Sequence, residues 1–228
     1  MNRIVIDKNS NIKVDKDTNY LIDNKVNKLK IDINNCNVNI LSIKENTDDE
    51  EYEFNINKGS LTFNNICFDS KDLNININLN KDKSEVKVIN SVIANTYKKV
   101  KIIVNHNYKN TTSNIYNNGI TKKDGSINFD VVSKVPKGIT GCQVNQDSKI
   151  ISLNKSNNNE INPVLLIDEY DTSARHAAFI GKYNEDKMFY LQSRGLTKAK
   201  AEKLLLDGML VGTLDICFEE KESLKKKI

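Results

Sequence analysis

The chain has 228 residues, of which 38% are hydrophobic and 7% are aromatic, and its formal net charge is +4. This length suits one good-sized domain or two small ones, and the low aromatic content predicts an aliphatic core. The mild charge forms no basic stripe with stacking aromatics, which argues against nucleic-acid binding. No stretch approaches the roughly 20 apolar residues of a membrane helix, and residues 1–10 lack the apolar core of a signal peptide. We therefore expect a cytoplasmic protein that does not enter a membrane.

Short alternating strands dominate the chain before residue 184. The clearest is Leu73–Leu79, in which four aliphatic residues alternate with asparagines and so place one face toward a core. A phase shift across Asn34-Asn35 predicts a corner between two strands, because asparagine tolerates the left-handed backbone region. Further strands are predicted at Ile4–Ile6, Leu29–Ile33, Cys36–Ile40, Glu85–Ile93, Val100–Val104, Ser126–Val132, Lys149–Leu153 and Pro163–Ile167.

Many short strands at near-regular intervals are typical of a sandwich, a barrel or a β-helix. Asparagine enrichment favours the β-helix slightly, since stacked coils let asparagine side chains hydrogen-bond along the stack. Coding bias in an AT-rich genome explains the same enrichment, so asparagine alone leaves the architecture open. The four cysteines show no CxxC spacing and predict buried free thiols rather than a metal site or disulfides.

The pattern becomes helical at residue 184. Asn184 is a suitable N-cap, Glu185 and Asp186 complement the positive end of the helix dipole, and Gly195 can end the helix in a left-handed conformation. Thr197 can cap a second helix whose predicted buried face contains Ala201, Leu204, Leu205 and Met209. A third helix is predicted from about residue 214, with a buried face of Leu214, Cys217 and Phe218. We expect a β-domain over residues 1–183 and a helical domain over 184–228.

The C-terminal half contains the runs Asn162–Ile167, His176-Ala177-Ala178 and Phe189–Leu196. Together they resemble the SufB/SufD family, the scaffold proteins of the SUF iron–sulfur cluster assembly machinery. The spacing from Ile167 through His176 to Arg194 is kept without a gap, and the FYLQSRG element is the specific part. Resemblance is firm over roughly 127–210 and only architectural before that.

The resemblance implies a mainly β fold, a right-handed parallel β-helix followed by a small C-terminal α-helical domain. In the family, the C-terminal helices dock a SufC-type ABC ATPase, and the β-helix pairs with a second SufB/SufD-type protomer. Nascent iron–sulfur clusters form at the protomer interface, so we expect a transient cluster there and no tightly bound cofactor. ATP hydrolysis belongs to the partner, because Gly138–Gly141 lacks the Lys-Ser/Thr of a phosphate-binding loop.

Departures from the family pattern place the chain nearer SufD than SufB, in a shortened form. SufB-type members have a cysteine where this chain has Asn157. SufD-type members often have one where it has Ala174. His176 occupies the position of a SufD-type interface histidine and is the candidate iron or cluster ligand, since a neutral imidazole can ligate iron. The alternative is a histidine that packs between the β-helix and the helical domain. His106 has no such support and is interpreted as a surface or strand histidine.

The resemblance assigns the partner surface to the helical hairpin, at Phe189, Tyr190, Arg194, Gly195 and Leu196. We expect Phe189 and Tyr190 to fill the seam between hairpin and β-body. Arg194 is expected to act as a cation at the C-terminal end of the first helix.

The sequence therefore predicts a SufD-like scaffold subunit without catalytic residues of its own. One alternative is a self-pairing minimal SufB-like scaffold in a reduced SUF system. Another, from a different class, is a β-helix binding or adhesion protein, which would need an export signal and acidic or aromatic clusters on one face; neither is visible.

Overall fold

The computed structural model describes residues 3–69, 71–153, 158–182 and 185–227. About 58% of the chain is strand, wound into a parallel β-solenoid of about six coils. The strands are β1 (Ile4–Ile6), β2 (Ser10–Val14), β3 (Thr18–Ile22), β4 (Lys28–Glu45), β5 (Glu50–Phe68), β6 (Leu73–Leu79), β7 (Glu85–Ala94), β8 (Tyr97–His106), β9 (Thr112–Thr121), β10 (Ser126–Val135), β11 (Cys142–Ser152), β12 (Glu160–Ile167) and β13 (Thr172–Gly181). The helices are α1 (Glu185–Ser193), α2 (Lys198–Leu210) and α3 (Phe218–Lys225).

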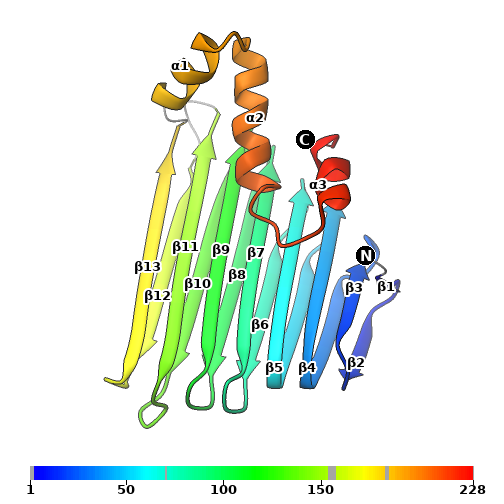
Figure 1. Ribbon diagram of the computed structural model, residues 1–228, viewed down its shortest axis with the longest axis vertical. Helices are drawn as coiled ribbons and strands as arrows, with labels where there is room; N and C mark the ends of the chain where they lie inside the picture. Colours follow the sequence, from blue (N-terminus) through cyan, green and yellow to red (C-terminus); the bar gives the residue numbers. More distant parts are fainter. Residues whose placement is uncertain (1–2, 70, 154–157, 183–184, 228) are drawn as a thin grey trace.

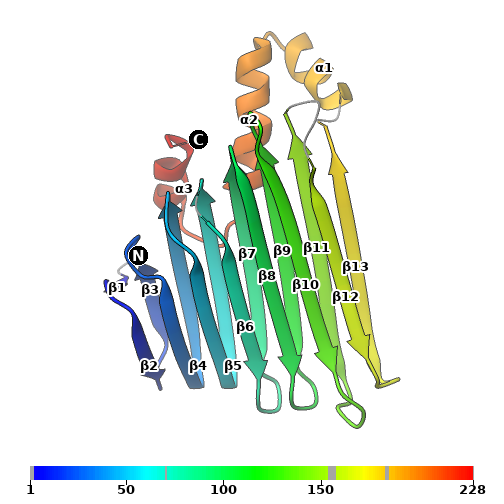
Figure 2. The ribbon, with the colours of Figure 1, turned by 180° about the vertical axis from the view of Figure 1, so that it is seen from behind.

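Each coil contributes one strand to a front sheet and one to a back sheet, and the coils rise with a right-handed turn (Figures 1 and 2). The strand order β12-β10-β8-β6-β5-β7-β9-β11-β13 passes from back to front through β5, which belongs to both sheets. Every neighbouring pair in this order is parallel. The predicted β-helix followed by helices is confirmed, and the sandwich and barrel alternatives are wrong.

The corners that join the two sheets depend on left-handed backbone conformations. Asn35 has the predicted left-handed conformation, with φ 55°. The strands predicted on either side of it are nevertheless one bent strand, β4, so the prediction of two separate strands is wrong. The equivalent corner of the next coil has Lys58 at φ 83° and Gly59 at φ 104°. A Cβ atom on Gly59 would lie 2.0 Å from the carbonyl oxygen of Cys36 in the coil below. Close stacking of corners therefore requires glycine at this position.

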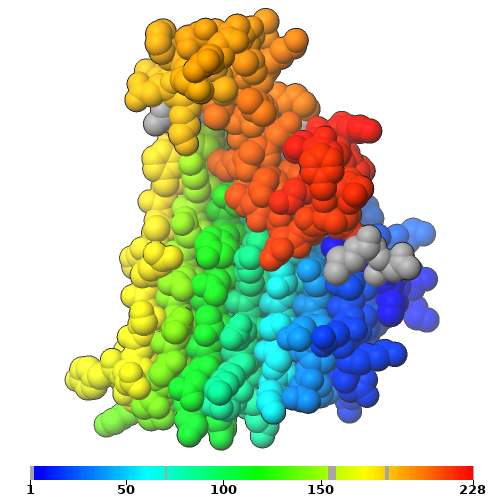
Figure 3. All heavy atoms as spheres, in the orientation of Figure 1, coloured from blue at the N-terminus to red at the C-terminus, as the bar shows by residue number. Residues whose placement is uncertain are grey.

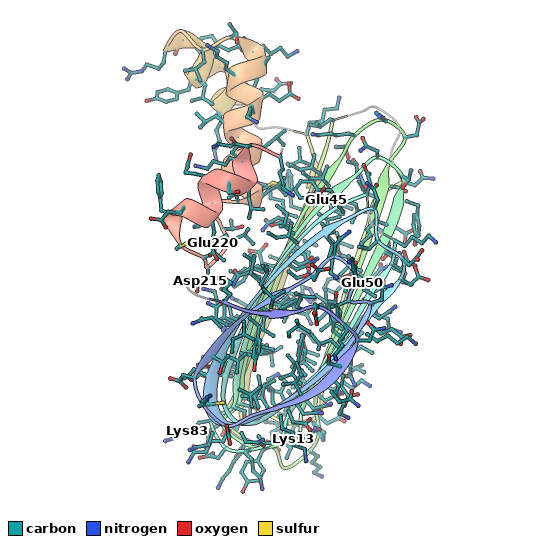
Figure 4. The ribbon with its side chains drawn as sticks, turned by 90° about the vertical axis from the view of Figure 1, so that its right-hand side faces the viewer. Lys13, Glu45, Glu50, Lys83, Asp215 and Glu220 are labelled. Carbon is teal, nitrogen blue, oxygen red and sulfur yellow. The ribbon has the colours of Figure 1, made fainter. Side chains whose placement is uncertain are left out.

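Apolar side chains from both sheets fill the interior of the solenoid. The centre is an aromatic cluster in which the rings of Phe54 and Phe63 lie 5.3 Å apart and Tyr52 meets Phe63 edge to face. Isoleucine, valine and leucine occupy most other inward positions, as the composition predicts. Glu50 is also buried between the sheets (Figure 4), where it accepts hydrogen bonds from Thr47 and Tyr52.

Asparagine side chains form hydrogen-bonded ladders along the stack, which confirms the structural interpretation of the asparagine enrichment. One ladder links Asn34, Asn57, Asn80 and Asn107 through amide contacts of 3.1, 3.0 and 2.9 Å. A second, inside the solenoid, links Asn65, Asn90, Asn117 and Ser148. The amides in the middle of each ladder donate to one coil and accept from the other, which pairs polar groups without charge. At the end of the inner ladder, Asn65 donates to Asn90, but its buried Oδ1 has no partner among the described residues.

The helices cover the upper outer face of the front sheet. Leu206, Leu210 and Leu214 pack on outward-facing isoleucines of β5, β7, β9 and β11. Ser91 donates to the carbonyl oxygen of Leu210 at 2.7 Å. Arg3 donates twice to the carboxylate of Glu220, at 2.6 and 3.0 Å, and this nearly buried ion pair fixes α3 against the first coil.

The predicted helices exist, but their buried faces differ from the prediction. Thr197 caps α2, with its hydroxyl accepting from the Lys200 amide at 3.4 Å. The buried face of α2 contains Ala201, Leu206 and Leu210, whereas Leu204 is 51% exposed. The third helix begins at Phe218, with Cys217 as its N-cap, and Phe218 is 70% exposed rather than buried.

Two sequence predictions lie outside the described residues. They are the Asn184 cap and the exact domain boundary between residues 183 and 184. All four cysteines are free thiols, and Cys36, Cys67 and Cys142 are buried.

Substituting Gly59 by alanine tests the close stacking of corners. We expect Gly59→Ala to lower the free energy of unfolding by about 3 kcal/mol, because a left-handed alanine costs about 1–2 kcal/mol and displacing packed atoms costs a similar amount. Gly138→Ala is the matched control, because Gly138 has φ +86° but nothing within 4 Å of an added Cβ. Denaturant unfolding measures both, and equal losses would contradict the stacking argument.

Candidate functional site

The last coil of the solenoid is open. Strands β12 and β13 are the two ends of the strand order, so each presents one edge of backbone donors and acceptors without a strand beside it. The inward-facing positions of β12 are half-buried rather than buried, namely Ile161, Pro163, Leu165 and Ile167. Apart from half-buried Thr172 and Gly181 at its ends, all residues of β13 are exposed. A solenoid interior is thus accessible at this end.

His176 lies in this open coil and faces the solenoid axis. Its register partner on β11 is Gln146, and the same row continues through Ile115, Val88 and Phe63. Those four positions are buried, but His176 is exposed because no further coil covers it. It does not pack between the solenoid and the helices, as the alternative prediction required.

Small side chains flank the histidine on the inward face of β13. Ala174 and Ala178 occupy the inward positions before and after it, and both are exposed. On the outer face, Arg175 extends an outer ladder by donating through Nε to Asn145 at 2.8 Å. The result is a shallow opening around one imidazole, framed by the two edge strands.

The other histidine is buried. His106 is fully excluded from solvent at the end of β8, where Nδ1 lies 2.8 Å from the Thr111 hydroxyl and Nε2 lies 2.9 Å from the Ser113 hydroxyl. Burial lowers the pKa of His106 to about 4, so the ring is neutral at physiological pH. It is a strand histidine, as predicted, but not a surface one.

Helix α1 stands beyond the end of the front sheet, whereas the C-terminal part of α2 packs on its upper end; the front faces of β11 and β13 lie uncovered below the hairpin (Figure 3). None of the nine residues of α1 is buried. Phe189 is 75% exposed and Tyr190 is 57% exposed, so the prediction that they fill the seam with the β-body is wrong. A groove of about 370 Å³ runs between the two helices and is lined by Asp186, Lys187, Tyr190, Leu191, Leu204 and Leu205.

The turn between the two helices has the predicted geometry. Gly195 adopts φ 90°, its amide donates to Gln192, and the Leu196 amide donates to Leu191. This pair of bonds is a Schellman motif, which satisfies two carbonyls at the end of α1. Arg194 extends outward with its guanidinium 5.4 Å from the Tyr190 ring centroid.

The sequence did not reveal that Leu204 is exposed and Leu205 only half-buried in this groove. Their spacing with Ala201 looks like one buried stripe, and helical periodicity does not reveal which apolar stripe faces the protein. The run Leu204-Leu205-Leu206 carries apolar residues around a wide arc. That width was the available signal that α2 has a second apolar face.

The described residues contain no group of three or more His, Cys, Asp or Glu side chains placed to hold a metal ion. None of the described helices is both long and apolar enough to span a membrane.

Comparison with known proteins gives a consistent family. Residues 4–209 match the model for "SUF system FeS cluster assembly, SufBD core domain". The iron-sulfur cluster assembly protein SufD of Bacillus subtilis is 35% identical over 96 residues, which are 42% of this chain and 22% of that protein. A SufBD family protein of Mycobacterium tuberculosis is 28% identical over 105 residues, 46% of this chain and 12% of that protein. The chain thus spans less than a quarter of the length of these relatives.

The buried His106 predicts a loss of stability in mild acid. The unfolded state takes up a proton near pH 6.5, whereas the folded state does so only near pH 4, so stability falls as the pH drops through this window. Between pH 7 and pH 5 we expect the wild type to lose about 2 kcal/mol of unfolding free energy relative to His106→Gln. Denaturant unfolding at the two pH values measures this difference. Wild type and His106→Gln with the same change in unfolding free energy between pH 7 and pH 5 would contradict it.

Proposed function

This chain belongs to the SufBD core family of SUF-system FeS cluster assembly proteins, and we propose that it is a SufD-like, non-enzymatic scaffold subunit. In this proposal its open last coil pairs with a second SufB/SufD-type protomer. Its α1–α2 hairpin docks a SufC-type ABC ATPase, and a nascent iron–sulfur cluster is the cargo of the protomer interface.

The observation that carries the proposal is the exposure of His176, which faces the interior of the solenoid but is uncovered at the open coil. A solenoid that ends without a cap leaves edge strands that are prone to pair with another chain. Val164 and Leu166 on β12 and Phe179 on β13 are exposed on its outer faces. A second protomer that covers this end would supply partners for both edges and bury the apolar side chains. The same end serves a homodimer or a heterodimer, so the self-pairing minimal scaffold stays open.

His176 is then positioned in the seam between the two protomers. Its imidazole faces the axis of the solenoid, where a covering protomer would approach most closely. In the proposed assembly it contributes one ligand to the cluster, and the remaining ligands come from the second protomer. A cluster held in this way can leave when the seam opens, which suits cargo rather than a resident cofactor.

The hairpin has the features of a docking element. The groove between α1 and α2 has an apolar floor formed by Leu191, Leu204 and Leu205, and Tyr190 and Arg194 stack at its margin. Aromatic and arginine side chains around an apolar pocket are typical of interface hot spots.

Contacts below the hairpin support mechanical coupling. Asn64 and Asp215 exchange two hydrogen bonds, and Lys87 forms an ion pair with Asp215 at 2.9 Å. The helical segment is therefore fastened to the front sheet at several points. Movement imposed on the hairpin by an ATPase would be passed to the sheet whose last strand carries His176.

Co-purification with a SufC-type ATPase tests the docking surface. We expect Tyr190→Asp and Leu204→Asp each to weaken capture roughly 30-fold, since losing a buried interface anchor costs about 2 kcal/mol. Phe218→Asp is the matched control, because Phe218 is equally exposed but lies on α3 outside the groove. The docking proposal is wrong if the folded wild type does not bind the ATPase, or if all three variants weaken its capture equally.

Replacing His176 tests the proposed interface chemistry. We expect His176→Ala to reduce cluster assembly about tenfold or more when it is reconstituted with both partners, because the variant removes a ligand that water replaces poorly. The unfolding free energy of the isolated chain should not change, since the side chain is exposed.

Sedimentation of the same samples provides the control for pairing. A wild-type chain that stays monomeric with itself and with a SufB-type protomer would rule out the paired scaffold. Unchanged assembly by a correctly paired His176→Ala variant would instead show that the imidazole is not a ligand.

A further inference from the structure

Gln146 bridges the interior of the solenoid directly beneath the open coil. Its side chain extends inward from β11 and is only 2% exposed. Nε2 lies 2.9 Å from the Ser133 hydroxyl on β10 and 3.3 Å from the carbonyl oxygen of Val164 on β12. The amide therefore connects the front sheet to both of the last two back strands.

These contacts fix the orientation of the amide. The Val164 carbonyl can only accept a hydrogen bond, so the NH₂ group of Gln146 must face it. Oε1 consequently takes no part in the contacts with Ser133 and Val164. That oxygen is buried and has no hydrogen-bond partner among the described residues. An unsatisfied buried acceptor is costly, and a nearby donor that can reach it would stabilise the fold.

The nearest ring donor in the register is His176. Gln146 and His176 are paired positions on β11 and β13, and adjacent strands lie about 4.8 Å apart. Both side chains face the solenoid axis. Ala174 and Ala178 leave space on either side of the imidazole, so the ring can turn toward the amide below.

We propose that Gln146 is a positioning residue for His176, with Oε1 accepting a hydrogen bond from one ring N–H of the imidazole. This bond fixes the tautomer and the ring plane. The second ring nitrogen is then the unprotonated one, and it faces out of the open coil toward whatever covers that end. Hydrogen bonding of one nitrogen is the usual way that proteins orient a histidine for ligation by the other.

This inference rests on the proposed function in one respect, the role given to the hydrogen bond. That role is to present an unprotonated ring nitrogen of His176 at the interface between the two protomers. The hydrogen bond itself is a property of the isolated chain. It can therefore be tested without an ATPase, a second protomer or a cluster.

Nitrogen NMR of the histidine rings provides the test, because the chain has only two histidines. In ¹⁵N-histidine-labelled wild type at neutral pH, we expect His176 to show one dominant tautomer and a ring proton protected from exchange. In Gln146→Met, which keeps the length of the side chain but lacks the acceptor, the tautomer ratio should change about fivefold, as expected for a hydrogen bond of about 1 kcal/mol.

Gln143→Met is the matched control, since Gln143 lies on the same strand but is exposed; it should leave the His176 signals unchanged. A wild-type His176 with an ordinary tautomer mixture and an unprotected ring proton would overturn the proposal, whether or not the variants fold. One dominant His176 tautomer that depends on Gln146, together with unchanged cluster assembly by His176→Ala, would support the positioning and show that the ligand role in the proposed function is wrong.

Discussion

In-register hydrogen bonding between successive coils is the constraint on which the rest of this structure depends. The ladder from Asn34 to Asn107 repeats at 23, 23 and 27 residues, so coil length can vary only within the corners. Insertions are accommodated in corners that contain left-handed residues such as Lys83 and Lys123, while the strands keep their register. Each amide is both donor and acceptor, so one residue type repeated along the row satisfies every rung. Charged side chains of a single sign would repel one another in the same arrangement.

A repeated coil has no built-in feature that terminates the stack. The two ends of this solenoid differ in whether another part of the chain covers them. At the first coil, Arg3 is tied to Glu220, so the C-terminal helix secures that end. At the last coil, β12 and β13 remain edges and an inward row finishes in a histidine. In earlier coils this inward row consists of the buried apolar residues Phe63, Val88 and Ile115. It becomes polar at Gln146 and His176. The polar end of this row lies where the interior meets the surface.

Much of this fold was predictable from local pattern. Period-two alternation located strands such as Leu73–Leu79, and the phase shift at Asn34-Asn35 located a corner, because both depend on neighbouring residues. The choice of a β-helix over other β folds came from the resemblance, not from alternation. The buried faces of the helices were not predictable in the same way. Phe189, Leu204 and Phe218 lie outward because the front sheet offers a limited apolar patch, which Leu206, Leu210 and Leu214 already fill. His176 was found by family pattern, whereas its relation to Gln146 needed the register.

The ion pair between Arg3 and Glu220 joins residues 217 positions apart, and this has a consequence for biosynthesis. Coils can stack one after another as the chain leaves the ribosome, because each contacts mainly the coil before it. The outward-facing isoleucines of the front sheet, however, remain exposed until α2 and α3 have been synthesised and can cover them. The chain must be synthesised as far as Glu220 before the first coil gains its contact with α3. The nascent chain therefore exposes the apolar outer face of its front sheet until the residues of α2 and α3 have been synthesised.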